Sequence, residues 1–256
     1  QGTPGEVTDS AADGSHGTAF NGPTIESDTE RGSVGRFDGV DDYVEIPGDG
    51  LLENVTDASF TFAAWAKPMS VPPKTDANPP ANDWNYTIMG RPGWHLSMGY
   101  SNNKRYFLSM YTEDPPASAQ SFWINTPQFE PEEWHHLTEV VDDAAKTVSL
   151  YVDGQLAAST SYTGTLRDYG TSPYYIGAMT GAAYNWFFDG YIDDVRIFDK
   201  ALDEAEITRI YGEMQYNDSG LTTGSDYCYR VSPFKSDSCP NWLSHAAEED
   251  YTAPAE

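Results

Sequence analysis

Five aspartates in two short stretches of the chain have the residue type and spacing that could bind a metal ion. Asp38, Asp41 and Asp42 lie within one turn-like stretch, and Asp193 and Asp194 form a later pair. Carboxylates held close together repel one another, and a calcium ion with six to eight oxygen ligands relieves that repulsion. If the two stretches are neighbours in the fold, the predicted ligands of a structural calcium are Asp38, Asp41, Asp42 and Asp193, with backbone carbonyls completing the shell.

The same aspartates have a structural alternative. Asp side chains often accept hydrogen bonds from nearby backbone amides and so cap turns. Arg36 and Arg196 stand close by in the sequence, and either could form an ion pair with these carboxylates. Asp193 and Asp194 are adjacent in a predicted strand, so we expect their side chains to point to opposite faces. The sequence leaves the metal and the capping interpretations open.

A second group of residues has the chemistry of sugar recognition. Trp84 and Trp186 each stand beside an asparagine and close to a tyrosine, in segments that are predicted to be loops. Aromatic rings offer flat apolar faces on which sugar C–H groups stack, and Asn or Arg beside them can bond hydroxyls. The predicted ligand-binding residues are Trp84, Asn85, Tyr86, Arg91, Trp94, Tyr184, Asn185 and Trp186. The alternative for each ring is packing on the core, which we expect of Phe62, Trp65 and Trp134.

The amino-acid composition limits the kinds of ligand that these residues could bind. The 256 residues include 40 Asp or Glu and 14 Lys or Arg, which gives a formal net charge of −26. Such a polyanion repels a phosphate backbone, so a nucleic-acid binder with a basic face is excluded. The sequence has no apolar run of about 18 residues, so no membrane insertion is predicted. An aromatic content of 14% favours a folded chain over a disordered acidic one.

Two cysteines near the end of the chain, Cys228 and Cys239, are close enough in sequence to form one local disulfide. A disulfide implies an oxidising compartment, and we therefore expect a secreted or cell-surface protein. The alternative is a pair of free thiols. Two cysteines without histidines at ligand spacing do not form a zinc site.

The candidate metal- and sugar-binding residues must be positioned by short predicted strands, each of which ends at turn-forming residues. One segment alone has helical rhythm: Leu202, Ile207 and Ile210 share a stripe, with Asp203 as the predicted N-cap. Residues 1–33 are rich in turn formers and are predicted to be mostly loop. Without alternating strands and helices, the pattern predicts an all-β, two-sheet antiparallel sandwich or jelly roll. The expected strands are 35–37, 43–46, 59–66, 86–90, 94–98, 106–111, 121–124, 135–142, 147–152, 174–178 and 190–198.

Several blocks resemble one family in chain order. The run Phe37-Asp38-Gly39-Val40-Asp41-Asp42-Tyr43-Val44-Glu45-Ile46 resembles the opening strand of the laminin-G-like, concanavalin A-like jelly-roll domains. Residues 60–65 resemble the next strand, and 133–137 with 150–154 resemble the central hairpin. Residues 190–198 and the helix that follows resemble the closing strand and helix. The resemblance covers about residues 7–213, and it implies that the opening and closing strands lie side by side.

The last part of the chain is different. Residues 220–231, which include Tyr227-Cys228-Tyr229-Arg230-Val231, are similar to the end of a fibronectin type III domain. A whole domain of that type does not fit in residues 214–256. We therefore expect a laminin-G-like domain over 1–213 and a β-hairpin extension over 214–256. The extension offers unpaired strand edges, so assembly with copies of itself or other surface proteins is an alternative function.

The resemblance implies a non-catalytic module that binds a polysaccharide or glycoconjugate, often with calcium. Catalysis has less support in the sequence. A glycosidase needs two carboxylates about 5–10 Å apart, and the Glu-x-Asp-x-x-Glu run of the jelly-roll glucanases is absent. No Gly-x-Ser-x-Gly elbow or paired zinc ligands occur either. A polysaccharide-active enzyme with an unrecognised carboxylate or histidine site stays as the second alternative.

Overall fold

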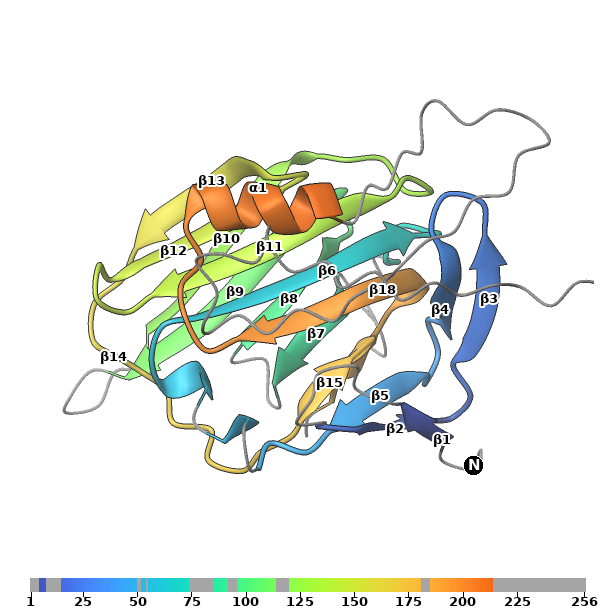
Figure 1. Cartoon of the computed structure of the whole chain (residues 1–256), viewed down its shortest axis with the longest axis horizontal. Coiled ribbons are helices and arrows are strands. Elements are labelled where there is room, and N and C mark those ends of the chain that lie inside the picture. Colours follow the sequence, from blue (N-terminus) through green and yellow to red (C-terminus); the bar gives the residue numbers. More distant parts are fainter. Residues whose placement is uncertain are drawn as a thin grey trace, which may run out of the picture.

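The computed structural model shows two antiparallel β-sheets stacked face to face, with one helix on the outside (Figure 1). It describes residues 5–7, 15–49, 52–53, 55–73, 85–91, 96–113, 120–180 and 185–213. The predicted fold class, an all-β sandwich with one short helix, is confirmed. The proposed extension over 214–256, the fibronectin-like stretch and both cysteines lie outside the described residues. None of the described helices is long and apolar enough to cross a membrane.

The larger sheet has nine strands, ordered β1-β2-β5-β15-β7-β8-β9-β10, with β14 paired to β9. Beside it, β16 (Ala178–Thr180) and β17 (Asn185–Phe187) form a separate two-stranded hairpin. The bounds of the nine strands are β1 Gly5–Val7, β2 Gly17–Phe20, β5 Tyr43–Ile46, β7 Asn85–Arg91, β8 Leu96–Ser101, β9 Arg105–Glu113, β10 Gln120–Gln128, β14 Thr165–Leu166 and β15 Tyr174–Ile176.

The smaller sheet has seven strands in the order β13-β12-β11-β6-β18-β4-β3. Its strands are β3 Thr24–Asp28, β4 Gly32–Asp38, β6 Phe60–Pro68, β11 His135–Asp142, β12 Thr147–Val152, β13 Gln155–Ser161 and β18 Asp189–Phe198. A short 3-10 helix, Val55–Asp57, precedes β6. The tight turn predicted at Asp153 and Gly154 is present, with φ of 51° and 74°.

The core lies between the two sheets because alternate side chains of each strand point inward. Phe62 and Leu137 from the smaller sheet and Met98 and Leu108 from the larger one are fully buried in the same apolar cluster. In β9, burial of Tyr106, Leu108 and Met110 in this core places the intervening residues on the outer face of the larger sheet.

The opening and closing parts of the chain meet as the family resemblance implies, but within one sheet only. β4 pairs with β18, and Asp38 lies opposite Asp189. The chain then turns through the Asp38–Asp42 segment and crosses to the larger sheet, where Tyr43 begins β5 beside β2. The two strands expected at 35–37 and 43–46 therefore belong to different sheets, and the acidic turn joins them at the rim of the sandwich.

The predicted helix is α1, Glu204–Glu213, and it lies across the outer face of the smaller sheet (Figure 1). Asp203 caps it: its carboxylate accepts a bond from the Glu206 amide at 2.9 Å, and Glu206 accepts one from the Asp203 amide. Ile207 and Ile210 are buried against Ala63 and Val140 of the sheet. The helix thereby covers part of a sheet face that would otherwise be exposed.

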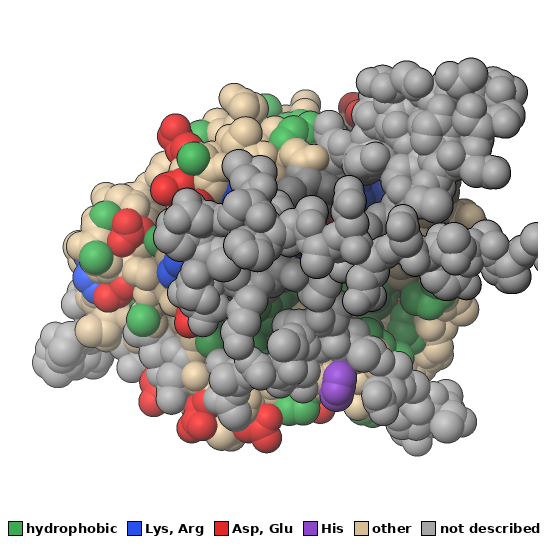
Figure 2. All heavy atoms as spheres, viewed as in Figure 1, with side chains coloured by type: hydrophobic (Ala, Val, Ile, Leu, Met, Phe, Trp, Pro, Cys, Tyr) green, Lys and Arg blue, Asp and Glu red, His purple; other side chains and the backbone are tan. Residues whose placement is uncertain are grey.

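The first 33 residues, predicted to be mostly loop, contain three strands, β1, β2 and β3. Four of the five residues of β3 are exposed, so this edge strand has no alternation of apolar and polar residues to reveal it. Figure 2, drawn from the same side as Figure 1, shows Asp and Glu side chains at several places around the rim of the molecule. This distribution agrees with the net charge of −26.

Candidate functional site

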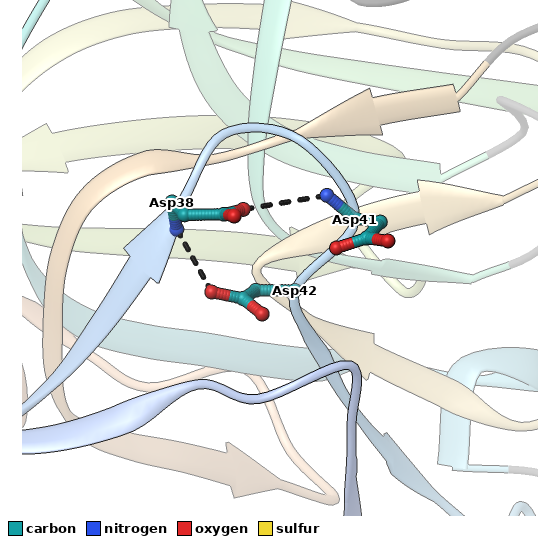
Figure 3. Close-up of side chains that lie close together, drawn as sticks. All are labelled: Asp38, Asp41 and Asp42. Carbon is teal, nitrogen blue, oxygen red and sulfur yellow. Dashed lines mark hydrogen bonds between the residues drawn. The ribbon is translucent and has the colours of Figure 1, made fainter. Parts of the chain in front are cut away.

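The acidic turn brings three of the four predicted metal ligands together. Carboxylate oxygens of Asp38, Asp41 and Asp42 lie within 4.8 Å of one another. Figure 3 shows the three side chains in the turn between β4 and β5. The turn is held by its own side chains: Asp38 Oδ1 accepts bonds from the amides of Val40 and Asp41, and Asp42 Oδ2 accepts one from the Asp38 amide. The turn-capping expectation therefore holds for Asp38 and Asp42.

Packing against β18 fixes the shape of this turn. Gly39 has a φ of 77°, and a Cβ there would lie 2.7 Å from the Cβ of Asp189. A side chain at position 39 would therefore strain the backbone and collide with the neighbouring strand. Asp42 is buried, and desolvation together with the nearby Asp38 carboxylate raises its pKa above the ordinary value. A cation at the turn would offset that cost.

The structure does not bring Asp193 to the turn. Asp189 is the residue of β18 opposite Asp38, and Asp193 lies four positions further along, opposite Trp65. Asp193 and Asp194 also do not point apart as expected. A bulge after Asp193, with Asp194 at a φ of 48°, directs both carboxylates to Arg31, at 2.9 and 2.6 Å. The predicted ligand set is thus corrected to the three turn residues.

The predicted sugar-binding residues of β7 are buried. The guanidinium of Arg91 donates to Thr56 Oγ1, to the Tyr174 hydroxyl and to the carbonyls of Gly170 and Ser172. Tyr86 is buried in the core, with its hydroxyl 2.7 Å from Ser70 Oγ, and Asn85 is also buried. Tyr86 and Arg91 point into the sandwich, whereas Asn85, next to Tyr86 on β7, is buried on the opposite face of the strand.

The remaining predicted residues belong to the β16–β17 hairpin or to undescribed segments. Trp84, Trp94 and Tyr184 lie outside the described residues. Asn185 begins β17, where its backbone pairs with Thr180. Trp186, in the same strand, is 7% exposed. Trp186 therefore packs, but it does so on the outer face of the larger sheet and not between the sheets.

An aromatic cluster on that outer face contains Trp186 and two residues that sequence reasoning missed. Phe107 of β9 lies at its base, with the Trp123 ring at 4.9 Å and the Trp186 ring edge-on at 6.4 Å, and the two tryptophans lie 6.0 Å apart. Met179 completes the buried part. Trp123 is 39% exposed, which makes it a large exposed apolar side chain supported by two other rings.

Polar groups surround this cluster. Ser97 of β8 and Ser109 of β9 lie on the same face, and their hydroxyls are 2.9 Å apart. Asn125 of β10 pairs with Phe107 and is exposed. The two serines are buried, so the groups that a sugar can reach are the Trp123 ring and the Asn125 amide, an arrangement suited to binding a sugar. The strand predicted over 121–124 places Trp123 and Ile124 on opposite faces, but three apolar residues in a row do not reveal that Ile124 is the one that points into the core.

Comparison with known proteins gives the family. A family model described as the concanavalin A-like lectin/glucanases superfamily, Laminin_G_3, matches residues 38–208, from the acidic turn into α1. The chain belongs to this superfamily. No curated protein sequence matches the chain. The laminin-G-like resemblance of the opening, central and closing blocks is thus confirmed.

Solved structures share this superfamily fold at low sequence identity. The binding domain of Paraclostridial Mosquitocidal Protein 1 is 14% identical, with a TM-score of 0.59, over 80% of this chain and 49% of that one. The binding domain of Botulinum Neurotoxin DC in complex with SialylT is 13% identical, with a TM-score of 0.58, over 82% and 48%. Trypanosoma rangeli sialidase in complex with the inhibitor DANA is 19% identical, with a TM-score of 0.50, over 77% and 29%. The chain spans about half the length of the toxin domains.

Proposed function

We propose that this laminin-G-like domain is a non-catalytic, secreted carbohydrate-binding module. Its binding surface is the outer face of the nine-stranded sheet, around Phe107, Trp123 and Trp186. The observation that carries the proposal is the partly exposed Trp123 ring, which Phe107 and Trp186 hold in place. Because the ring is already positioned, stacking a sugar on it orders little additional structure.

Two further observations support the proposal. Structural relatives include toxin binding domains, one of them in complex with SialylT. A sialidase also shares the fold, so catalysis is the competing function. Among the described side chains, the outward positions of β8 and β9 around the cluster are Ser97, Gly99, Phe107 and Ser109. None of these four positions is a carboxylate, and glycoside hydrolysis requires two.

The experiment is a glycan-binding screen of the purified chain, followed by titration with the best ligand. Trp123→Ala should weaken binding roughly tenfold or more, since aromatic anchors contribute most of the affinity at such sites. The control is Leu156→Ala, which also removes an exposed apolar side chain, but from edge strand β13 of the other sheet. Equal weakening by both variants, or no binding to any glycan in the screen, would reject the proposal.

We also propose one structural calcium at the acidic turn. The carboxylate spacing in the turn suits an ion bound at 2.3–2.6 Å. Asp38, Asp41 and Asp42 would hold it, and the bound ion would offset the burial and the repulsion from Asp38 that raise the pKa of Asp42. Calcium should raise the melting temperature of the wild type, and the increase should disappear in Asp41→Asn, whose carboxylate caps no backbone amide of the turn. An unchanged melting temperature in calcium would contradict the site.

A further inference from the structure

The outer face of the nine-stranded sheet also carries an arginine without an acidic partner. Arg105 begins β9 and lies two residues before Phe107, on the same face. It is half-buried, and its guanidinium donates to the Thr126 carbonyl at 2.6 Å. No described carboxylate lies within ion-pair distance of it. The backbone carbonyl fixes the guanidinium in place and leaves most of its five donors available.

Arg105 is one of few cations in a chain with 40 acidic and 14 basic residues. Six other described cations form ion pairs with carboxylates; they are Arg31, Arg36, Lys67, Lys104, Lys146 and Lys200. Even Lys104, the residue next to Arg105, is paired with Glu130. A partly exposed guanidinium that stays unpaired among so many carboxylates can accept an anionic group from a ligand.

Arg105 is aligned with the proposed sugar-binding ring. Along β9 and β10, Ser109 lies opposite Trp123, Phe107 opposite Asn125, and Arg105 opposite Gln128. Same-face positions on a strand are about 7 Å apart, so the row from Trp123 to Arg105 extends about 14 Å. Its order is an aromatic ring, an exposed amide and a guanidinium. That length suits a short oligosaccharide better than a single sugar.

We propose that this row binds acidic oligosaccharides, with Arg105 bonding a sugar carboxylate while Trp123 stacks on a neighbouring ring. The inference rests on the proposed carbohydrate-binding function. A guanidinium and a carboxylate match in shape and form paired charge-assisted hydrogen bonds, which are stronger than bonds to neutral hydroxyls. The net charge of −26 does not prevent this contact, because at physiological ionic strength repulsion from distant carboxylates is screened beyond about 8 Å.

Titration calorimetry with two matched ligand pairs tests the proposal. One pair is an oligogalacturonate and its methyl ester, and the other is sialyllactose and its methyl ester. In each pair one member lacks the carboxylate charge. The wild type should bind the acidic member of at least one pair roughly tenfold more tightly, and the pair that responds identifies the source of the carboxylate. Arg105→Gln should abolish that preference by weakening binding of the acidic member far more than binding of the neutral one.

Control variants distinguish a wrong role for Arg105 from a wrong carbohydrate-binding function. Lys104→Gln removes a neighbouring charge that is already paired, so it should keep the acidic preference, and Arg105→Lys should retain only part of it. Equal binding of acidic and neutral members by the wild type, or equal weakening of both by Arg105→Gln, would overturn the role of Arg105 while leaving glycan binding intact. Failure of both members of both pairs to bind, with no effect of Trp123→Ala in the wider screen, would overturn both proposals together.

Discussion

The outer faces of the two sheets use similar residues in different ways. On the seven-stranded sheet, the Arg31 guanidinium lies 4.2 Å from the Trp65 ring and is paired with Asp193 and Asp194. On the nine-stranded sheet, Trp123 is partly exposed and Arg105 has no described carboxylate partner. Rings and cations that contact each other stabilise the fold, whereas rings and cations that stay apart remain available to a ligand.

The seven-stranded face continues this pattern across its strands. The Lys67 ammonium lies 5.6 Å from the rings of both Trp134 and Tyr191, and it pairs with Asp28. Arg36 lies over Tyr191 and pairs with Asp189. Each cation therefore contacts a ring and a carboxylate. We infer that this face holds β3, β4 and β18 together, and that recognition takes place on the other sheet.

The largest predicted effect concerns a carboxyl group on the inner side of the seven-stranded sheet. Glu139 of β11 lies between Phe62 and Leu150, is fully buried, and has no hydrogen-bond partner on either oxygen. Desolvation raises its pKa from 4.5 to about 8. Below pH 4.5 both states are protonated. Between pH 4.5 and 8 only the unfolded chain loses the proton, so stability falls as the pH rises.

Glu139→Gln should remove this loss. Since each pKa unit corresponds to about 1.4 kcal/mol, the full effect is on the order of 5 kcal/mol at pH 8 and above. Urea unfolding of the variant and the wild type at a series of pH values measures it. The difference between the two isolates Glu139 from His136, whose pKa of about 4 gives the opposite slope between pH 4 and 6.5. A difference that does not change with pH would contradict the prediction.

Two tryptophans test the contrast between the faces directly. Trp65 is 4% exposed and stacks with Tyr211 at 5.8 Å beneath Arg31, whereas Trp123 is 39% exposed. Trp65→Ala should cost about 4 kcal/mol of unfolding free energy, as for other buried Trp-to-Ala changes. Trp123→Ala should cost about 1 kcal/mol and act on glycan binding instead. Similar stability losses in urea unfolding would mean that both faces are structural.

Part of this arrangement could be predicted from the sequence. Alternation in β6 and β12, the Asp153–Gly154 turn and the capping box of α1 are local patterns, and each is present. The burial of Arg91 could not be predicted, because its partners Thr56 and Tyr174 lie 35 and 83 residues away. The position of the Asp193 carboxylate beside Arg31 depends on a bulge in β18, which no local sequence pattern reveals. Sequence thus predicted elements well and long-range partners poorly.

Replacing Arg31, on the outer face of the seven-stranded sheet, should have a smaller effect on stability. Arg31→Met keeps part of the apolar stem over Trp65 but leaves the carboxylate of Asp193, whose pKa burial already raises, without its main partner. We expect a loss of about 2 kcal/mol, less than for a fully buried pair because both aspartates retain some contact with water. Adding Asp193→Asn should restore part of the loss in urea unfolding. No recovery in the double variant would show that ring contacts, not charge, make the contribution of Arg31.

The smallest effect compares two buried threonines, one from each sheet. On β6, Thr61 Oγ1 donates to the Lys200 carbonyl at 2.8 Å and accepts from the Leu202 amide at 3.0 Å, whereas on β7 the hydroxyl of Thr87 is buried without a hydrogen-bond partner. Replacement by valine keeps the shape in both cases. Thr61→Val should cost about 2 kcal/mol, because it leaves two backbone groups unpaired near α1. Thr87→Val should be neutral or stabilise by up to about 1 kcal/mol, since it removes a polar group buried without a partner. A measured loss of stability for Thr87→Val would show that bound water satisfies the Thr87 hydroxyl on the outer face of the nine-stranded sheet. This face would then contribute polar interactions to the fold as well as to binding.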